Sequence, residues 1–205
     1  MRPIIAFFRD MTGLEPTKEQ ADFLHKAINK KFPQQLISAG RQSGKSLCVA
    51  VVLMWYLFEF KTVIHIQIIS AQRQYVYFHM VEVFKKHPEL MKELTERSLM
   101  GKDVIPIEGF TLKKGSMLQL AQATLKSVMG FPADIIVIDE ACQVPNDVIK
   151  YALGCLTGEN AKFILLSTPD IDTSLFVEWL NNPKSGFKIF TWSGDKEHCP
   201  WHNEK

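Results

Sequence analysis

The sequence has little cysteine, almost no net charge and no long apolar run. Its four cysteines are widely scattered and show no C-x-x-C spacing, which favours a reduced, intracellular setting over a disulfide framework. The formal net charge is only +2, so the composition neither demands nor excludes a nucleic-acid partner. The longest apolar stretch, residues 47–60, is too short to span a bilayer and contains Glu59. We therefore expect a buried helix there and no membrane span.

Internal repeats, low-complexity segments and a signal peptide are also missing. The apolar start at residues 4–8 ends at Arg9 and Asp10, so we expect a protein that is not secreted. A length of 205 residues suits one domain, and a hydrophobic content of 46% is enough for a buried core.

Residues 39–46 match a phosphate-binding loop. They read Ala-Gly-Arg-Gln-Ser-Gly-Lys-Ser, which fits G-x-x-x-x-G-K-[ST] with alanine in the first position. A short apolar run precedes the loop and a helix-forming apolar stretch follows it, which is the strand–loop–helix context that the motif requires. We predict that the whole loop contacts a nucleotide, through Ala39, Gly40, Arg41, Gln42, Ser43, Gly44, Lys45 and Ser46.

The residue types of this loop suit a triphosphate. Gly44 has no Cβ, so the backbone can come close to a phosphate, and successive N–H groups can point at the anion. Lys45 can place its charge on the β- and γ-phosphates, and the Ser46 hydroxyl can bind Mg²⁺. Arg41 adds a second cation, which is unusual inside such a loop.

Two adjacent acids follow a buried strand downstream. The apolar residues 135–138 end in Asp139 and Glu140, and paired carboxylates at such a position are costly without a cation. Asp139 fits as a Mg²⁺ ligand, and Glu140 fits as the base that polarises an attacking water. Alternatively, both are cap and first-turn acids of the next helix.

Three further polar residues are candidates with plainer alternatives. Ser167 and Thr168 follow the apolar run 163–166 and could sense a γ-phosphate, or they could only cap a turn before Pro169. Gln20 lies three residues after Thr17 and suits a capping box at a helix start. Its amide could instead recognise the N6/N7 edge of adenine, and the sequence leaves both roles open.

Apolar runs of strand type alternate with helical patterns along the chain. This alternation predicts an α/β fold with a mainly parallel central sheet flanked by helices, of the P-loop NTPase class. We expect a helix over residues 72–86, a short charged helix over 89–99, a strand piece at 104–107 and a hairpin turning at 113–116. Lys113 and Lys114 at this turn could touch a phosphate backbone or be plain turn residues.

Four of these elements together resemble a known family. Residues 17–20, 41–46, 135–141 and 166–169 occur in the order found in the N-terminal ATPase domain of the large terminase subunit, the DNA-packaging motor of tailed phages and related viruses. The most specific feature is Arg41 joined to Gln-x-Gly-Lys-Ser. The resemblance extends over residues 1–192, which we expect to form the ATPase domain, with 193–205 as a tail or the start of a linker to a nuclease domain.

The resemblance implies a RecA/ASCE-like fold and a role for each motif. Lys45, Glu140 and Arg41 would be catalytic, Ser46 and Asp139 would hold Mg²⁺, and Gln20 would contact the adenine of ATP. Ser167 and Thr168 would couple hydrolysis to movement.

The resemblance also implies partners and a location. They are double-stranded DNA, a portal protein, a small terminase subunit and a ring of identical subunits in the host cell cytoplasm, although the isolated domain could be a monomer. A neighbouring subunit would supply an arginine, for which Arg73 and Arg97 are candidates.

Two other classes of protein share some of these motifs. A superfamily 2-like helicase or DNA translocase has a similar glutamine motif, P-loop and Asp-Glu pair, but it needs a second RecA-like domain. A nucleotide-binding module without turnover would not need an acid such as Glu140 beside the Mg²⁺ ligand.

Overall fold

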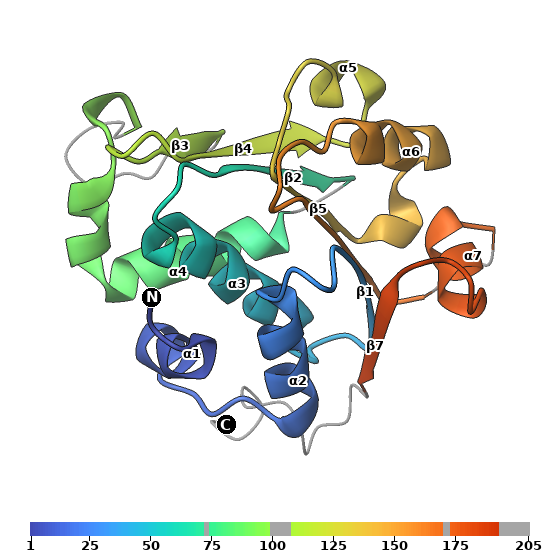
Figure 1. The fold of residues 1–205 in the computed structure, drawn as a ribbon, viewed down its shortest axis with the longest axis horizontal. Helices are drawn as coiled ribbons and strands as arrows, with labels where there is room; N and C mark the ends of the chain where they lie inside the picture. The colour runs from blue at the N-terminus through green and yellow to red at the C-terminus, as the bar shows by residue number, and fades with distance from the viewer. Residues whose placement is uncertain (72–73, 99–107, 170–172, 193–205) are drawn as a thin grey trace.

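The computed structural model describes residues 1–71, 74–98, 108–169 and 173–192. A seven-stranded sheet with the order β3-β4-β2-β5-β6-β1-β7 runs through the centre of the molecule (Figure 1). Among the described strands, only β3 pairs in the antiparallel direction, so the predicted mainly parallel sheet is confirmed. The strands are β1 (Gln34–Ala39), β2 (His65–Ser70), β3 (Gly109–Thr111), β4 (Met117–Gln122), β5 (Ile135–Asp139), β6 (Lys162–Ser167) and β7 (Lys188–Trp192).

Helices cover both faces of the sheet (Figure 1). One face carries α1 (Ile4–Thr12), α2 (Lys18–Ala27), α3 (Lys45–Glu59) and α4 (Tyr75–Lys86). The other carries α5 (Leu125–Val128), α6 (Asn146–Gly154) and α7 (Leu175–Asn181). Neighbouring residues of a strand point to opposite faces, so Ile68 packs with the first group of helices and Ile69 with the second.

Helix α3 is enclosed on nearly every side. Its residues from Leu47 to Leu57 are all buried, because α1, α2 and α4 surround it and the sheet lies behind it. A helix that is apolar all round has to be buried in this way, and the predicted buried helix is confirmed. The enclosure fixes the direction of its N-terminus, which the phosphate-binding loop precedes.

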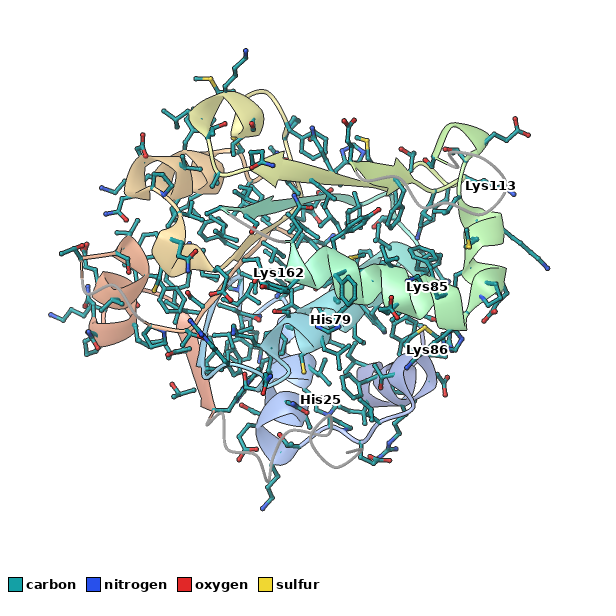
Figure 2. The ribbon with its side chains drawn as sticks, turned by 180° about the vertical axis from the view of Figure 1, so that it is seen from behind. His25, His79, Lys85, Lys86, Lys113 and Lys162 are labelled. Atoms are coloured by element: carbon teal, nitrogen blue, oxygen red, sulfur yellow. The ribbon has the colours of Figure 1, made fainter. Side chains whose placement is uncertain are left out.

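A buried lysine joins α2 to the sheet. Lys162, at the start of β6, is 1% exposed, and Figure 2 shows it in the interior. Its ammonium group donates to the carbonyls of Asn29 and Phe32, just beyond the C-terminal end of α2, where a cation is favourable. Burial lowers the pKa of Lys162 to about 8. These bonds hold the helix that carries Gln20 against the sheet.

The structure differs from the sequence prediction at one helix. Residues 89–99 do not form the charged α-helix that we expected, and the described part consists of two 3₁₀ turns, η1 (Pro88–Glu93) and η2 (Glu96–Ser98). Between them Leu94 is buried in an antiparallel bridge to Leu112, and this tertiary pairing interrupts the helix. The strand piece expected at 104–107 lies outside the described residues.

The predicted hairpin is confirmed by the pairing of β3 with β4. At its turn, the ammonium group of Lys114 donates to the carbonyl of Phe60 at 2.6 Å, so this side chain lies against its own protein. That contact favours the turn interpretation of Lys114 over contact with DNA.

None of the described helices is long and apolar enough to cross a membrane.

Helix α1 offers a first test of the packing. Its apolar face includes Phe7, which is fully buried in the core, so Phe7→Ala should cost about 3–5 kcal/mol of unfolding free energy. Arg9→Ala on the same helix is the control and should cost less than about 1 kcal/mol, because the Arg9–Glu15 ion pair is exposed. Urea unfolding measures both, and equal losses would contradict the packing of α1 described above.

Candidate active site

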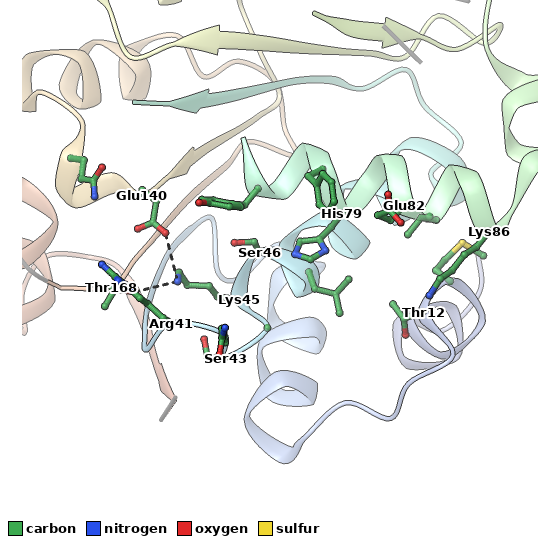
Figure 3. Close-up of a pocket in the computed structure, with 18 residues that line it drawn as sticks. Thr12, Arg41, Ser43, Lys45, Ser46, His79, Glu82, Lys86, Glu140 and Thr168 are labelled. Carbon is green, nitrogen blue, oxygen red and sulfur yellow. Dashed lines mark hydrogen bonds and ion pairs between the residues drawn. The ribbon is translucent and has the colours of Figure 1, made fainter. Parts of the chain in front are cut away.

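A cavity of about 980 Å³ opens at the carboxyl edge of the sheet (Figure 3). Its floor is the loop between β1 and α3, residues 41–47. A second wall comes from the ends of β5 and β6, with Glu140, Gln143 and Thr168, and a third from one face of α4 and the end of α1. Loops that follow parallel strands meet at the same edge of a sheet, which is where α/β proteins place their ligands.

The loop at the cavity floor has the geometry of an anion cradle. Gly44 is the N-cap of α3 with φ 78°, and Gln42 has φ 60°. A Cβ on Gly44 would lie only 2.8 Å from Nε2 of Gln20. Both the left-handed backbone and the lack of space therefore require glycine. The free N–H groups at the start of α3 face the cavity and favour a negatively charged ligand.

Gln20 supports this loop from behind. Its Oε1 accepts a hydrogen bond from the backbone N–H of Thr17 at 3.0 Å, and its Nε2 donates to the carbonyl of Ser43 at 3.1 Å. The predicted capping box between Thr17 and Gln20 is confirmed. Gln20 is 3% exposed and does not line the cavity, so its contact with adenine stays a prediction that this arrangement does not favour.

Lys45 reaches across the cavity floor to the strand ends. Its Nζ lies 3.3 Å from Oγ1 of Thr168 and 3.8 Å from Oε1 of Glu140. The side chains of Lys45 and Glu140 are 7% and 19% exposed, so this ion pair is screened little by solvent. Figure 3 shows the three side chains converging.

Glu140 has a strained backbone that aims its carboxylate. Its φ is 53°, which is uncommon outside glycine and costs on the order of 1–3 kcal/mol. Its Oε2 lies 3.3 Å from the hydroxyl of Ser167, which also accepts from the N–H of Cys142 at 3.3 Å. The predicted motif at the end of β6 therefore orients the predicted catalytic acid.

Asp139 lies directly behind the cavity and is fully buried. Its Oδ2 accepts from the N–H of Val76, at the start of α4, at 3.2 Å, while Oδ1 has no partner among the described residues. Burial, with a smaller contribution from the nearby Glu140 carboxylate, raises the pKa of Asp139 to about 7. Lys45 is close enough to act on this pKa in the opposite direction.

The unpartnered Asp139 oxygen and the Ser46 hydroxyl at the cavity floor fit a hard divalent cation. Among the described residues, no group of three or more His, Cys, Asp or Glu side chains forms a cage for a metal. This matches Mg²⁺, which keeps water ligands and is held by one or two protein groups together with phosphate oxygens.

The comparisons with known proteins agree with this geometry. The family model of the terminase large subunit, T4-like virus type, N-terminal part, matches residues 36–188. This chain belongs to the terminase large subunit family. A search of curated protein sequences found no significant match.

Solved terminase structures share the fold. The large terminase of bacteriophage HK97 superposes with a TM-score of 0.72 at 18% identity, over 95% of this chain and 44% of the HK97 chain. The large terminase ATPase domain of Thermus phage P74-26 gives a TM-score of 0.69 at 19% identity, over 96% of this chain and 88% of that domain. The large terminase of another thermophilic bacteriophage, solved in complex with ATP-γ-S, gives a TM-score of 0.59 at 15% identity, over 90% of this chain and 46% of that one.

In this terminase chain the predicted site residues fall into two layers. Those that line the cavity are Arg41, Gln42, Ser43, Gly44, Lys45, Ser46, Glu140 and Thr168. Those that lie outside the cavity lining are Gln20, Ala39, Gly40, Asp139 and Ser167. Ala39 still contributes, because its carbonyl accepts from the Thr168 hydroxyl at 3.0 Å. Arg73 and the side chain of Arg97 lie outside the described residues.

Sequence reasoning missed the third wall of the cavity. Tyr75, Phe78, His79 and Glu82 on α4 line it, and so does Gln143 beyond the acidic strand. A signal was present, because large aromatic residues recur in residues 72–86 on the face opposite the one that predicted the core contacts. Gln143 had no comparable signal.

The support from Gln20 can be tested by substitution. Gln20→Ala removes a cap contact and the bond to Ser43, so it should lower the unfolding free energy by about 1–3 kcal/mol and weaken nucleotide binding. Thr17→Ala removes only the cap and should cost about 1 kcal/mol with unchanged binding. Urea unfolding and nucleotide titration measure both, and identical binding in the two variants would contradict a support role.

The buried charge of Asp139 predicts a pH effect. Its pKa is about 7 in the folded protein and 3.8 in the unfolded reference, so the folded state binds the proton more tightly. Its contribution to stability is therefore lost as pH rises from about 4 to about 7. At pH 8 in metal-free buffer, Asp139→Asn should have an unfolding free energy about 1 kcal/mol or more above that of the unsubstituted protein, and this advantage should shrink at pH 5.

The control for this measurement is Asp147→Asn, which changes an exposed carboxylate on α6. Urea unfolding at both pH values measures the difference. A stability difference between Asp139→Asn and the unsubstituted protein that does not vary between pH 5 and pH 8 would refute the perturbed Asp139.

Proposed function

We propose that this terminase domain hydrolyses ATP to ADP and phosphate with Mg²⁺, and that the reaction drives double-stranded DNA into a preformed capsid. The observation that carries the proposal is the approach of Lys45 to Glu140, 3.8 Å apart in a cavity whose floor is a phosphate-binding loop. A protein that only binds a nucleotide has no need for a strained acid at that point.

The ion pair suggests how the site changes when ATP enters. The loop N–H groups and Lys45 bind the phosphates. Lys45 then exchanges its contact with Glu140 for γ-phosphate oxygens. The released Glu140 carboxylate orients the attacking water and accepts its proton, while Ser167 holds the second carboxylate oxygen. Arg41, exposed at the rim of the cavity, can turn toward the γ-phosphate in cis.

Ser46 and Asp139 are the residues that would hold Mg²⁺. When bound, the ion neutralises part of the charge on the triphosphate. The unpartnered oxygen of the Asp139 carboxyl group supports this assignment. The thermophilic phage terminase solved with ATP-γ-S has the same fold, which supports nucleotide binding here.

The partners and the domain limits are proposed from the family. We assign residues 1–192 to the ATPase domain and 193–205 to a tail or the start of a linker to a nuclease domain. The chain spans 44% of the length of the HK97 terminase. DNA, a portal protein, a small terminase subunit and a ring of identical subunits in the host cell cytoplasm complete the proposed motor.

Steady-state phosphate release from ATP with Mg²⁺ tests the proposal. Lys45→Ala and Glu140→Gln should each lower the rate on the order of 10²-fold or more, because each removes a contact that stabilises the transition state. Glu140→Gln should retain ATP binding. The matched controls Lys126→Ala and Glu178→Gln change exposed residues outside the cavity and should leave the rate unchanged.

Binding of ATP without turnover, unchanged by Glu140→Gln at every protein concentration and with DNA and portal present, would favour a nucleotide-binding module and sink the proposed ATPase.

A further inference from the structure

One face of α4 is built unlike the rest of the protein surface. Tyr75, Phe78, His79, Glu82 and Lys86 follow one another at helical spacing, and all of them line the cavity. We call these five residues the α4 stripe. Figure 3 shows His79 and Lys86 pointing from α4 toward the loop and the end of α1.

The α4 stripe exposes aromatic surface that the core does not use. Phe78 is 58% exposed and Tyr75 is 43% exposed, whereas Val76, Met80 and Phe84 of the same helix are buried. Exposed aromatic groups that face a concave site are typical of ligand contacts. Across the cavity, Met11 at the end of α1 adds apolar lining.

The stripe continues from the phosphate end of the cavity. The N–H of Val76 binds Asp139, so the first turn of α4 lies beside the acidic pair. Phe78 and His79 come within the next turn, away from Lys45 and Glu140. Ligand sites of about 300–1,000 Å³ hold whole small molecules, so the cavity of about 980 Å³ has room for a nucleoside beyond the phosphates.

The residue expected to read the base faces elsewhere. Both amide atoms of Gln20 bind backbone groups, and Gln20 does not line the cavity. The base of a bound nucleotide therefore needs other partners, and the α4 stripe offers an aromatic surface and an imidazole.

We propose that the α4 stripe is the nucleoside subsite of this terminase domain, with the adenine base stacked on Phe78 and its edge hydrogen-bonded to His79. The inference rests on the proposed function, because it assumes that the phosphates of ATP occupy the loop. It assigns base recognition to a helix on the far side of the cavity from Gln20.

The chemistry of both side chains suits a purine. Stacking of a base on an aromatic side chain strengthens binding in a way that alanine substitution reveals, whatever the identity of the base. Burial lowers the pKa of His79, against the opposing effect of Glu82, so the imidazole is neutral near pH 7. A neutral imidazole has one donor and one acceptor, and the edge of adenine offers an acceptor ring nitrogen beside a donor amino group.

Competition binding separates the two ends of the site. ATP and inorganic tripolyphosphate are titrated against the unsubstituted protein, Phe78→Ala, Phe78→Tyr and Lys45→Ala. Phe78→Ala should weaken ATP about tenfold or more and leave tripolyphosphate unchanged, and Phe78→Tyr should restore ATP binding. Lys45→Ala should weaken both ligands. Tyr151→Ala, an exposed aromatic on α6 outside the cavity, is the matched control.

A second variant tests the edge contact. The unsubstituted protein should bind ATP several-fold more tightly than purine riboside triphosphate, which lacks the amino group, and His79→Leu should reduce that preference. An undiminished preference in His79→Leu would overturn the contact between His79 and the base.

The outcomes distinguish the inference from the function beneath it. ATP affinity unchanged by Phe78→Ala, in a protein that binds tripolyphosphate, would overturn the subsite and leave the phosphate site intact. Failure of the unsubstituted protein to bind tripolyphosphate or ATP would remove the proposed function and the subsite together.

Discussion

The contact between Lys45 and Glu140 is the interaction on which the site depends. It joins the loop after β1 to the end of β5, two segments far apart in the chain that meet because β1, β6 and β5 are parallel neighbours. Each strand ends at the same edge, so each loop presents its polar residues to the same space. Lys45 and Glu140 each hold the other's charge in a poorly solvated place, and a phosphate group competes directly for that arrangement.

Behind this ion pair, a layer of residues fixes the geometry. Gln20 binds the loop from α2, Ser167 orients Glu140, and Thr168 connects Lys45 to the carbonyl of Ala39. These contacts link four separate elements, so a small displacement of one loop is resisted by the others. Pre-organisation of this kind lets a site act without rearranging at the moment of reaction.

The same region carries costs that the core must offset. Glu140 has a left-handed backbone, and Asp139 is buried with one oxygen unpartnered among the described residues. Both features oppose folding and both suit a Mg²⁺-dependent reaction. The apolar enclosure of α3 supplies compensating stability next to them, since this helix is buried along almost its whole length.

The sequence alone determined the fold class, the phosphate loop, the acidic pair and the capping box of Gln20, because each follows from local spacing and residue type. It also predicted the buried face of α4, whose period is local. Only the tertiary structure decided that Gln20 supports the loop from behind, that Leu94 interrupts a helix and that Phe78 faces the cavity. Those outcomes depend on which distant segment lies opposite each residue, and packing sets that partner where local pattern cannot.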